Sequence, residues 1–419
     1  MNFDRMRALL LERAIRGELV PQLTEDGSIE QVGNGRGLFD IPKSWGWFEF
    51  SKVVKTLSSR GNQIPAKEIC ERGRFPVVTQ SKNSLIDGYS EEESKLVPKA
   101  FLPLLVFGDH TRFLKYVDFQ FIVGADGTKL IRPKDDGFVN CSYLYYVLRA
   151  LVPETKDRGY SRHFQFLKKL MIPVPPIHEQ CRIVDRVEEL LSEINRAEKA
   201  YEELQTLAGV LRGQILQEAI QGKLVPQLAE EGVVEQIGVA PDEVPFEIPE
   251  SWRWVTLASV GKTHTGTTPS TSKKEYFGSD IPFVKPGDID HCLLTYREDG
   301  LSTAAHEVAR LVPEKSLLMV CIGGSIGKVA VCDREISFNQ QINAIVCNEE
   351  WALPEYLFVI MRSPYFQDEV WRNATGTATP IINKSRWGKI WIPLPSTKEQ
   401  VRIVAKVEDL MKQVDALSA

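Results

Sequence analysis

One segment occurs twice in this chain, and this repeat constrains the fold more than any other feature. "IPVPPIHEQCRIVDRVEELL" at 172–191 returns as "IPLPSTKEQVRIVAKVEDLM" at 392–411, identical at 11 of 20 positions. A second pair, "ERAIRGELVPQLTEDGSIEQVG" at 12–33 and "QEAIQGKLVPQLAEEGVVEQIG" at 217–238, has its own constant offset. We name the segments at 12–33 and 217–238 head repeats and those at 172–191 and 392–411 tail repeats. The order head, variable segment, tail therefore occurs twice.

The central tail and head repeats are continuous, and apolar residues follow one another at alternating spacings of four and three. This heptad seam predicts a long helix from about His178 to Gln221, closed by Gly222 and Pro226. The C-terminal copy matches the first half of the seam and the N-terminal residues match its end. We therefore expect a pseudo-twofold circular arrangement, in which the chain ends form a split helix antiparallel to the central one. The predicted scaffold positions are Ile183, Val187, Leu190, Ile194, Ile403, Val407 and Leu410.

The two variable segments share little sequence, and both show short β-rich runs followed by a helical pattern. The predicted fold class is α/β (α+β), with two globular domains of mixed sheet and helices and a pair of long antiparallel helices. The pairs Trp45/Trp47 and Trp252/Trp254 recur with the repeats and are interpreted as packing anchors. The predicted divisions are 1–38 (helix completing the split scaffold helix), 39–171 (first globular domain), 172–245 (long central helix), 246–391 (second globular domain) and 392–419 (C-terminal scaffold helix).

Charge is distributed unevenly along the chain. The net charge is −5, yet residues 45–171 hold 20 Lys+Arg against 14 Asp+Glu, and residues 252–391 hold 15 of each. The acidic excess therefore lies on the repeats, and the variable segments can approach a polyanion. No apolar run reaches the length of a membrane span, and seven scattered cysteines without a CxxC pair favour a reduced cytoplasm.

Motifs for catalysis are weak throughout. "IGGSIGK" at 322–328 has Ile322 and Val329 where a phosphate-binding loop needs Gly and Ser or Thr, so a turn between strands is the better interpretation. "HEQCR" at 178–182 lacks the second His of a zinc protease helix, and the six His show no metal-ligand spacing. We predict neither a catalytic residue nor a metal site.

Polar clusters in both variable segments suit DNA instead. Arg and Lys can pair with guanine, Asn and Gln with adenine, and hydroxyl-rich or Lys-containing loops with phosphates. The predicted contacts in the first segment are Gln80, Lys82, Asn83, His110, Arg112, Arg158, Tyr160, Arg162 and His163. Those in the second are Thr267, Thr268, Ser270, Lys273, Lys274, Lys285, Lys328, Asn339, Gln340, Gln341 and Thr377.

Nearly the whole chain resembles the specificity subunits of type I restriction-modification systems. The tail repeats are similar to that family's conserved regions, and "GTTPSTSKKEYFGSDIPFVKPGDI", "FNQQINAI" and "FGDHTRFLKYVDFQFIVGADGTKLI" look like its target-recognition domains. The second tail repeat departs mildly at Ser396-Thr397-Lys398. The resemblance implies a non-catalytic chain that reads a bipartite site in double-stranded DNA. It implies as partners two modification subunits, which bind S-adenosylmethionine, and restriction subunits, which use ATP and Mg; this chain itself is expected to hold no cofactor.

Other functions fit parts of the pattern. The chain could serve a type IIB-like enzyme or a stand-alone methyltransferase, which the sequence does not separate from a type I system. A protein-protein adaptor with long organising helices is the alternative from a different class. An autonomous methyltransferase or nuclease is disfavoured, because the motifs for cofactor binding and catalysis are missing.

Overall fold

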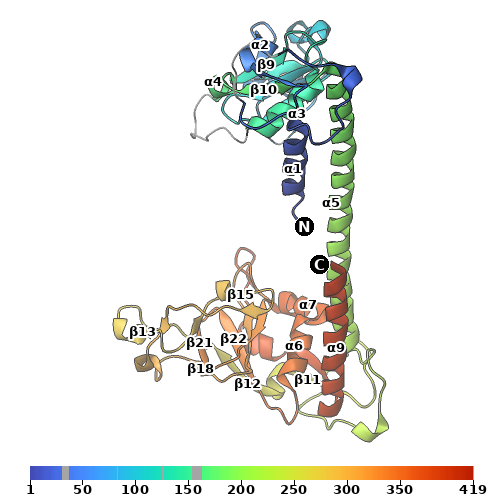
Figure 1. Ribbon diagram of the computed structural model, residues 1–419. Coiled ribbons are helices and arrows are strands. Elements are labelled where there is room, and N and C mark those ends of the chain that lie inside the picture. The colour runs from blue at the N-terminus through green and yellow to red at the C-terminus, as the bar shows by residue number, and fades with distance from the viewer. Residues whose placement is uncertain (31–36, 83, 125–126, 153–162, 419) are drawn as a thin grey trace. The chain divides into compact units, whose positions relative to one another are not determined.

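The computed structural model describes residues 1–30, 37–82, 84–124, 127–152 and 163–418. The chain forms two compact units, Met1–Tyr201 and Glu202–Ala419 (Figure 1). The boundary between the units falls inside the long helix α5 (Ile177–Ile220), which begins in the first unit and ends in the second. The predicted helix from His178 to Gln221 is thus confirmed to within one residue. The five-part division of the chain stays a prediction.

The first unit contains mixed sheet and helix. Its helices besides α5 are α1 (Phe3–Ile15), α2 (Phe50–Val53), α3 (Cys141–Leu151) and α4 (Phe164–Leu167). Its strands are β1 (Gly46–Glu49), β2 (Val54–Leu57), β3 (Gln63–Ile64), β4 (Phe75–Val78), β5 (Gly88–Ser90), β6 (Leu104–Gly108), β7 (Leu114–Val117), β8 (Ile122–Gly124), β9 (Thr128–Pro133) and β10 (Met171–Val174).

The second unit has the same kinds of element in a similar order. Its helices are α6 (Pro354–Arg362), α7 (Pro364–Asn373), α8 (Lys384–Gly388) and α9 (Thr397–Ser418). Its strands are β11 (Arg253–Thr256), β12 (Gly261–Thr265), β13 (Phe277–Gly278), β14 (Phe283–Val284), β15 (Ile289–Asp290), β16 (Leu293–Leu294), β17 (Gly300–Leu301), β18 (Leu311–Val312), β19 (Leu317–Val320), β20 (Val329–Val331), β21 (Ile336–Phe338), β22 (Ile342–Cys347) and β23 (Trp391–Leu394).

Both units contain an antiparallel four-stranded sheet of the same topology. Its order is β2-β9-β6-β7 in the first unit and β12-β22-β19-β20 in the second. A second sheet with parallel pairing accompanies each, of order β3-β8-β4-β5 in the first unit and β14-β21-β18 in the second. We call it the smaller sheet, because its strands are only two to four residues long. The two variable segments therefore share an architecture that their sequences do not reveal.

The antiparallel four-stranded sheet is the middle layer of each unit, because its strands are apolar on both faces. In the first unit Leu105 and Ile131 pack toward Leu144 and Val147 of α3, whereas Val106 packs on the opposite face, in a core that includes Val78 of the smaller sheet. In the second unit the layers repeat, with Tyr356, Leu357 and Ile360 of α6 on one face and Val284 and Phe338 on the other. Helix, large sheet and small sheet are thus stacked in that order.

Head and tail repeats contact each other inside each unit, through equivalent residues. In the first unit Arg182 of the tail repeat donates to the carboxylate of Asp26, at 2.5 Å, and to the carbonyl of Pro21. In the second, Arg402 donates to Glu231, at 2.6 Å, and to the carbonyl of Pro226. The repeated sequences therefore encode one junction that is built twice.

Glutamines of the tail repeats fix the variable segments to the same junctions. Gln180 accepts from the backbone N–H of Asn140, at the start of α3, and donates to the carbonyl of Pro175. Gln400 accepts from Leu353, at the start of α6, and donates to Pro395. Each junction thus clamps the first turn of the helix that covers the sheet.

The tryptophan pairs are buried, as their predicted role as anchors requires. Trp47 meets Phe39 and Trp254 meets Phe246 with ring centroids 4.9 Å apart in both units. Gly222 ends α5 at a φ of +70°, and a Cβ there would lie 2.4 Å from Pro249. Only glycine fits this conformation and this space.

The terminal helices run antiparallel to α5 within their units (Figure 1). Phe3 of α1 stacks near Tyr201 of α5, and Arg7 pairs with Glu198. Ser418 and Asp415 of α9 bond to Gln205 and Arg212 of α5. The predicted fold class is confirmed, whereas closure of the two units into a ring stays a prediction.

The predicted seam is buried mainly against the variable segments. Ile183, Val187, Ile403 and Val407 are buried in the cores below α3 and α6, and Leu190, Ile194 and Leu410 are partly buried. Farther along α5 the seam residues Leu204 and Leu211 are exposed.

None of the helices in the described part of the chain has the length and apolar character that crossing a membrane requires.

Candidate nucleic-acid interface

Most of the predicted DNA contacts lie at one end of the layered sheets in each unit. In the first unit β4 and β8 are parallel, so their carboxyl ends meet at one edge. Gly108 at the end of β6 pairs with Thr128 at the start of β9, which brings the β6–β7 turn to that same edge. The connections after β4, β6 and β8 therefore converge, although they are up to 50 residues apart in sequence.

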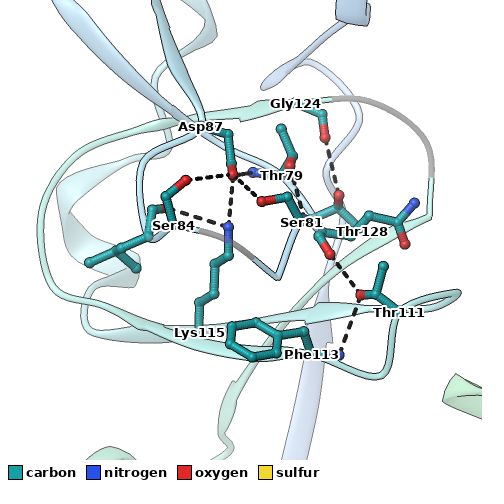
Figure 2. A network of polar contacts seen from close by, with 11 residues as sticks. Thr79, Ser81, Ser84, Asp87, Thr111, Phe113, Lys115, Gly124 and Thr128 are labelled. Carbon is teal, nitrogen blue, oxygen red and sulfur yellow. Dashed lines mark hydrogen bonds and ion pairs between the residues drawn. The ribbon is translucent and has the colours of Figure 1, made fainter. Parts of the chain in front are cut away.

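Hydrogen bonds lock these connections together. Thr111 donates to the carbonyl of Gln80 at 2.7 Å, and the backbone N–H of His110 donates to the Gln80 side chain at 3.2 Å. Asp109 N–H donates to the carbonyl of Gly127 at 2.7 Å. Figure 2 shows this region, with Thr79, Ser81 and Ser84 on one connection and Thr111 on the next. Gln80 and His110 are thus held together at this edge, and Lys82 is exposed on the same connection as Gln80.

The structure gives two of the predicted contacts a packing role. His163 is only 3% exposed, so its imidazole is not presented at the surface, and its backbone N–H donates to the carbonyl of Asp109. Arg112 is half-buried and donates to the carbonyl of Val152 at 2.7 Å. Asn83, Arg158, Tyr160 and Arg162 lie outside the described residues.

The same edge is rich in polar side chains in the second unit. Asn339, Gln340 and Gln341 follow β21, and Lys285 follows its parallel neighbour β14. Thr268, after β12, donates to Gln340 at 2.6 Å. The loop that carries Thr377 joins this edge through the pairing of Ile322 with Ile381.

These residues differ in exposure and therefore in the contacts that their side chains can make. Thr268, Gln340 and Thr377 are exposed, and Thr267, Lys285 and Gln341 are half-buried. Asn339 is buried, and its amide donates to Gln341 at 3.0 Å while its oxygen accepts from the Gln341 N–H. Gln340 and Gln341 can therefore offer amide groups to base edges, whereas Asn339 orients Gln341.

Three other predicted lysines of this unit lie on connections between its strands. Ser270, Lys273 and Lys274 are exposed on the stretch that leads to β13, and a hydrogen bond to Tyr276 raises the pKa of Lys273. Lys328, at the start of β20, pairs with Asp290 at 3.1 Å and lowers the pKa of that carboxyl group. The side chains of these three lysines can meet phosphates.

Several cations at or near the polar edges of the two units were not predicted from the sequence. Arg60 is exposed on the connection after β2, the strand that corresponds to β12, and thus occupies the place of Thr267 and Thr268. The dipeptide Arg60-Gly61, with Gly61 at a φ of +91°, is the signal that could have identified it.

A second group of cations surrounds His264 on β12. Burial, and then the positive charges of Arg310, Lys262 and Lys384, lower the pKa of His264. The N–H of Arg310 donates to the Thr267 hydroxyl at 2.9 Å, which joins the group to the predicted contacts. This basic patch, Lys262, Arg310 and Lys384, is spread over three elements and is invisible as a run in the sequence.

Comparison with known proteins agrees with this geometry. The family model described as "Type I restriction modification DNA specificity domain" matches residues 42–205 and 249–418. The Escherichia coli type I restriction enzyme EcoR124I/EcoR124II specificity subunit is 26% identical over 395 residues, covering 89% of this chain and 87% of that protein. The Haemophilus influenzae HindI specificity subunit is 34% identical over 166 residues, covering 38% and 35%.

Solved structures show the same fold. A chain from a study of complex assembly and conformational transition of the type I R-M system superposes with a TM-score of 0.66 at 18% identity, covering 91% of this chain and 93% of that one. The HsdS subunit from Thermoanaerobacter tengcongensis gives a TM-score of 0.55 at 19% identity, covering 91% and 92%.

The family model spans both units and most of the chain, so the protein belongs to the type I restriction-modification DNA specificity family. It is a specificity subunit, the non-catalytic component that recognises the DNA target. The polar edges of the two units are its candidate DNA-contacting surfaces.

Proposed function

We propose that this chain reads a bipartite, asymmetric sequence in double-stranded DNA, with one half-site for each unit. The observation that carries the proposal is the doubled junction. Arg182 with Asp26 and Arg402 with Glu231 build the same scaffold twice, while the connections above it carry different side chains. A repeated frame with two different polar edges is suited to two different half-sites.

The contact residues follow from their chemistry. Gln80, Gln340 and Gln341 would pair with adenine edges, and His110 would form hydrogen bonds to bases nearby. Phosphates, which fix the register without reading sequence, would be bound by Lys82, Lys273, Lys274, Lys285 and Lys328 and by the hydroxyls of Thr267, Thr268, Ser270 and Thr377.

The repeats would serve the other partners. Their acidic excess makes them poor DNA ligands, so they are left for protein contacts. Two modification subunits would dock on the two equivalent junctions, and restriction subunits would join them in the cytoplasm. S-adenosylmethionine, ATP and Mg would belong to those subunits.

The methylation pattern of the host tests this function. In cells that carry this chain with its modification subunit, methylome sequencing should yield one motif of two defined halves separated by a fixed gap. A strain without the chain is the control. Methylation at continuous motifs, or at several unrelated ones, would contradict reading by two units.

A further inference from the structure

Each unit contains an aspartate whose side chain is at most 9% exposed and which fastens the connection after a parallel strand. In the first unit this residue is Asp87, behind the connection 79–85 that follows β4. In the second it is Asp288, at the end of the connection 285–288 that follows β14. We call 79–85 and 285–288 the reading connections, since they carry Gln80, Lys82 and Lys285.

Asp87 is hydrogen-bonded to three residues of its reading connection, Thr79, Ser81 and Ser84 (Figure 2). One carboxylate oxygen accepts from the N–H of Thr79 at 2.7 Å. The other accepts from the hydroxyls of Ser81 and of Ser84, the latter at 3.0 Å. Gln80 and Lys82 therefore sit on a segment whose neighbours are tied to a single carboxylate.

A buried cation completes the arrangement. Lys115 of β7 lies 2.7 Å from Asp87, and its side chain is 3% exposed. Burial alone would raise the pKa of Asp87, but the hydrogen bonds from Lys115, Ser81 and Thr79 outweigh it and lower the pKa. The carboxylate is thus ionised at neutral pH, and removing one partner would leave the other charge buried.

Asp288 makes the corresponding contacts with different residues. It accepts from the N–H of Lys285, the first residue after β14, at 2.8 Å, as Asp87 accepts from the first residue after β4. Its cation is Arg297, which donates to the other oxygen. Lys115 lies 28 residues after Asp87, whereas Arg297 lies 9 residues after Asp288. The two units therefore form the same kind of ion pair with residues at different positions in the sequence.

We propose that Asp87 and Asp288 are positioning residues for target readout, each holding the reading connection of its own unit in the conformation that meets DNA. The inference rests on the proposed function. Neither carboxylate needs to touch DNA, because each acts through the amides and hydroxyls of its connection. A bidentate contact to a base tolerates little displacement, so a loosened connection loses discrimination before it loses affinity for phosphates.

The test compares Asp87→Asn and Asp288→Asn in the assembled methyltransferase, with the methylation motif as the readout. Each variant should relax one half of the motif, with about a tenfold loss of discrimination against single-base changes there. The other half should stay intact, which also shows that the complex is folded. The two variants therefore serve as controls for each other.

Lys115→Met should relax the same half of the motif as Asp87→Asn. Lys115→Arg keeps the positive charge and should leave that half of the motif largely unchanged. Arg132→Met is the matched control. Arg132 is also buried and pairs with Asp136, but it lies near the end of β9, whereas the polar edge is at the start of that strand. It should leave the motif unchanged.

Three results would overturn the inference. An unchanged motif in both aspartate variants, or relaxation of both halves by one variant, would show that the carboxylates do not position separate connections. Loss of all methylation in Asp87→Asn and Lys115→Met together would show that the pair supports the fold only. If the native motif is not bipartite, the proposed function itself fails, and this is seen before any variant is made.

Discussion

The cations of the basic patch face solvent without a carboxylate partner among the described side chains. Lys262 and Lys384 are exposed, and Arg310 is exposed beside Thr267. Cations in this state attract phosphate and release condensed counterions on binding. At the scale of single residues, the patch should therefore contribute affinity and leave base preference to Gln340 and Gln341.

Replacing Lys262, Arg310 and Lys384 by Ala tests this separation. The triple variant should weaken DNA binding by the assembled complex equally for cognate and non-cognate sequences. Each lost phosphate contact should lower the slope of log affinity against log salt by about 0.9. Titrations at several salt concentrations measure both quantities.

Gln340→Ala is the control for that experiment. It should reduce the preference for the cognate half-site and leave the salt slope unchanged. A triple variant whose salt slope equals that of the wild type would show that the patch does not face the DNA.

At the scale of elements, the junction of the second unit holds two carboxyl groups whose pKa values are shifted in opposite directions. Glu399, in the first turn of α9, is 3% exposed and accepts from Trp252 at 2.9 Å and from Gln227 at 2.6 Å. Burial and the nearby charge of Glu231 raise its pKa above 4.5, against the effect of these donors and of Arg402. The hydrogen bond from Arg402 instead lowers the pKa of Glu231.

The two groups should contribute opposite pH dependences to stability. A carboxyl group with a raised pKa binds its proton more tightly in the folded state, so its contribution to the free energy of unfolding falls as pH rises from about 4.5 through the folded-state pKa. Glu399→Gln removes this fall, and the variant should gain stability relative to the wild type as pH rises. Urea unfolding at pH values between about 4 and 7 measures the difference.

Glu231→Gln is the matched control, because the folded-state pKa of Glu231 is lowered. Its contribution is present above about 4.5 and is lost as pH falls through the folded-state pKa, so this variant should lose stability relative to the wild type as pH rises. Equal pH dependence in the two variants would contradict the assignment of the junction charges.

The long helix and the repeats were predictable, because their signal is periodic and doubled. The alternation of Ile183, Val187 and Leu190, followed by Gly222, is sufficient to place α5. The shared sheet of the two variable segments was not predictable, since strands such as β14 and β18 are two residues long and pair through register rather than pattern. Residue type alone likewise suggested Asn339 and His163 as contacts, whereas tertiary packing buries both.

Part of the candidate site also could not be predicted from the sequence. The clusters around Gln80 and His110 were found as polar stretches, but their meeting depends on the parallel pairing of β4 with β8. Asp87 was missed because its hydrogen-bond partners include Lys115, which only the fold brings within reach.

At the scale of the whole molecule, the chain is one frame repeated with two different polar edges. Each edge is built from the connections of its own sheets, and each junction clamps its own α3 or α6 through Gln180 or Gln400. A variable segment should therefore be replaceable as a module, provided that both ends of the junction are kept.

Exchange of residues 46–171 for the corresponding segment of another specificity subunit tests this central claim most directly. The exchanged chain, expressed with its modification subunit, should methylate a new bipartite motif in which one half is changed and the other half is kept. An exchange that changes both halves, or neither half of a motif that is still methylated, would contradict the account of two independent readers on one repeated scaffold.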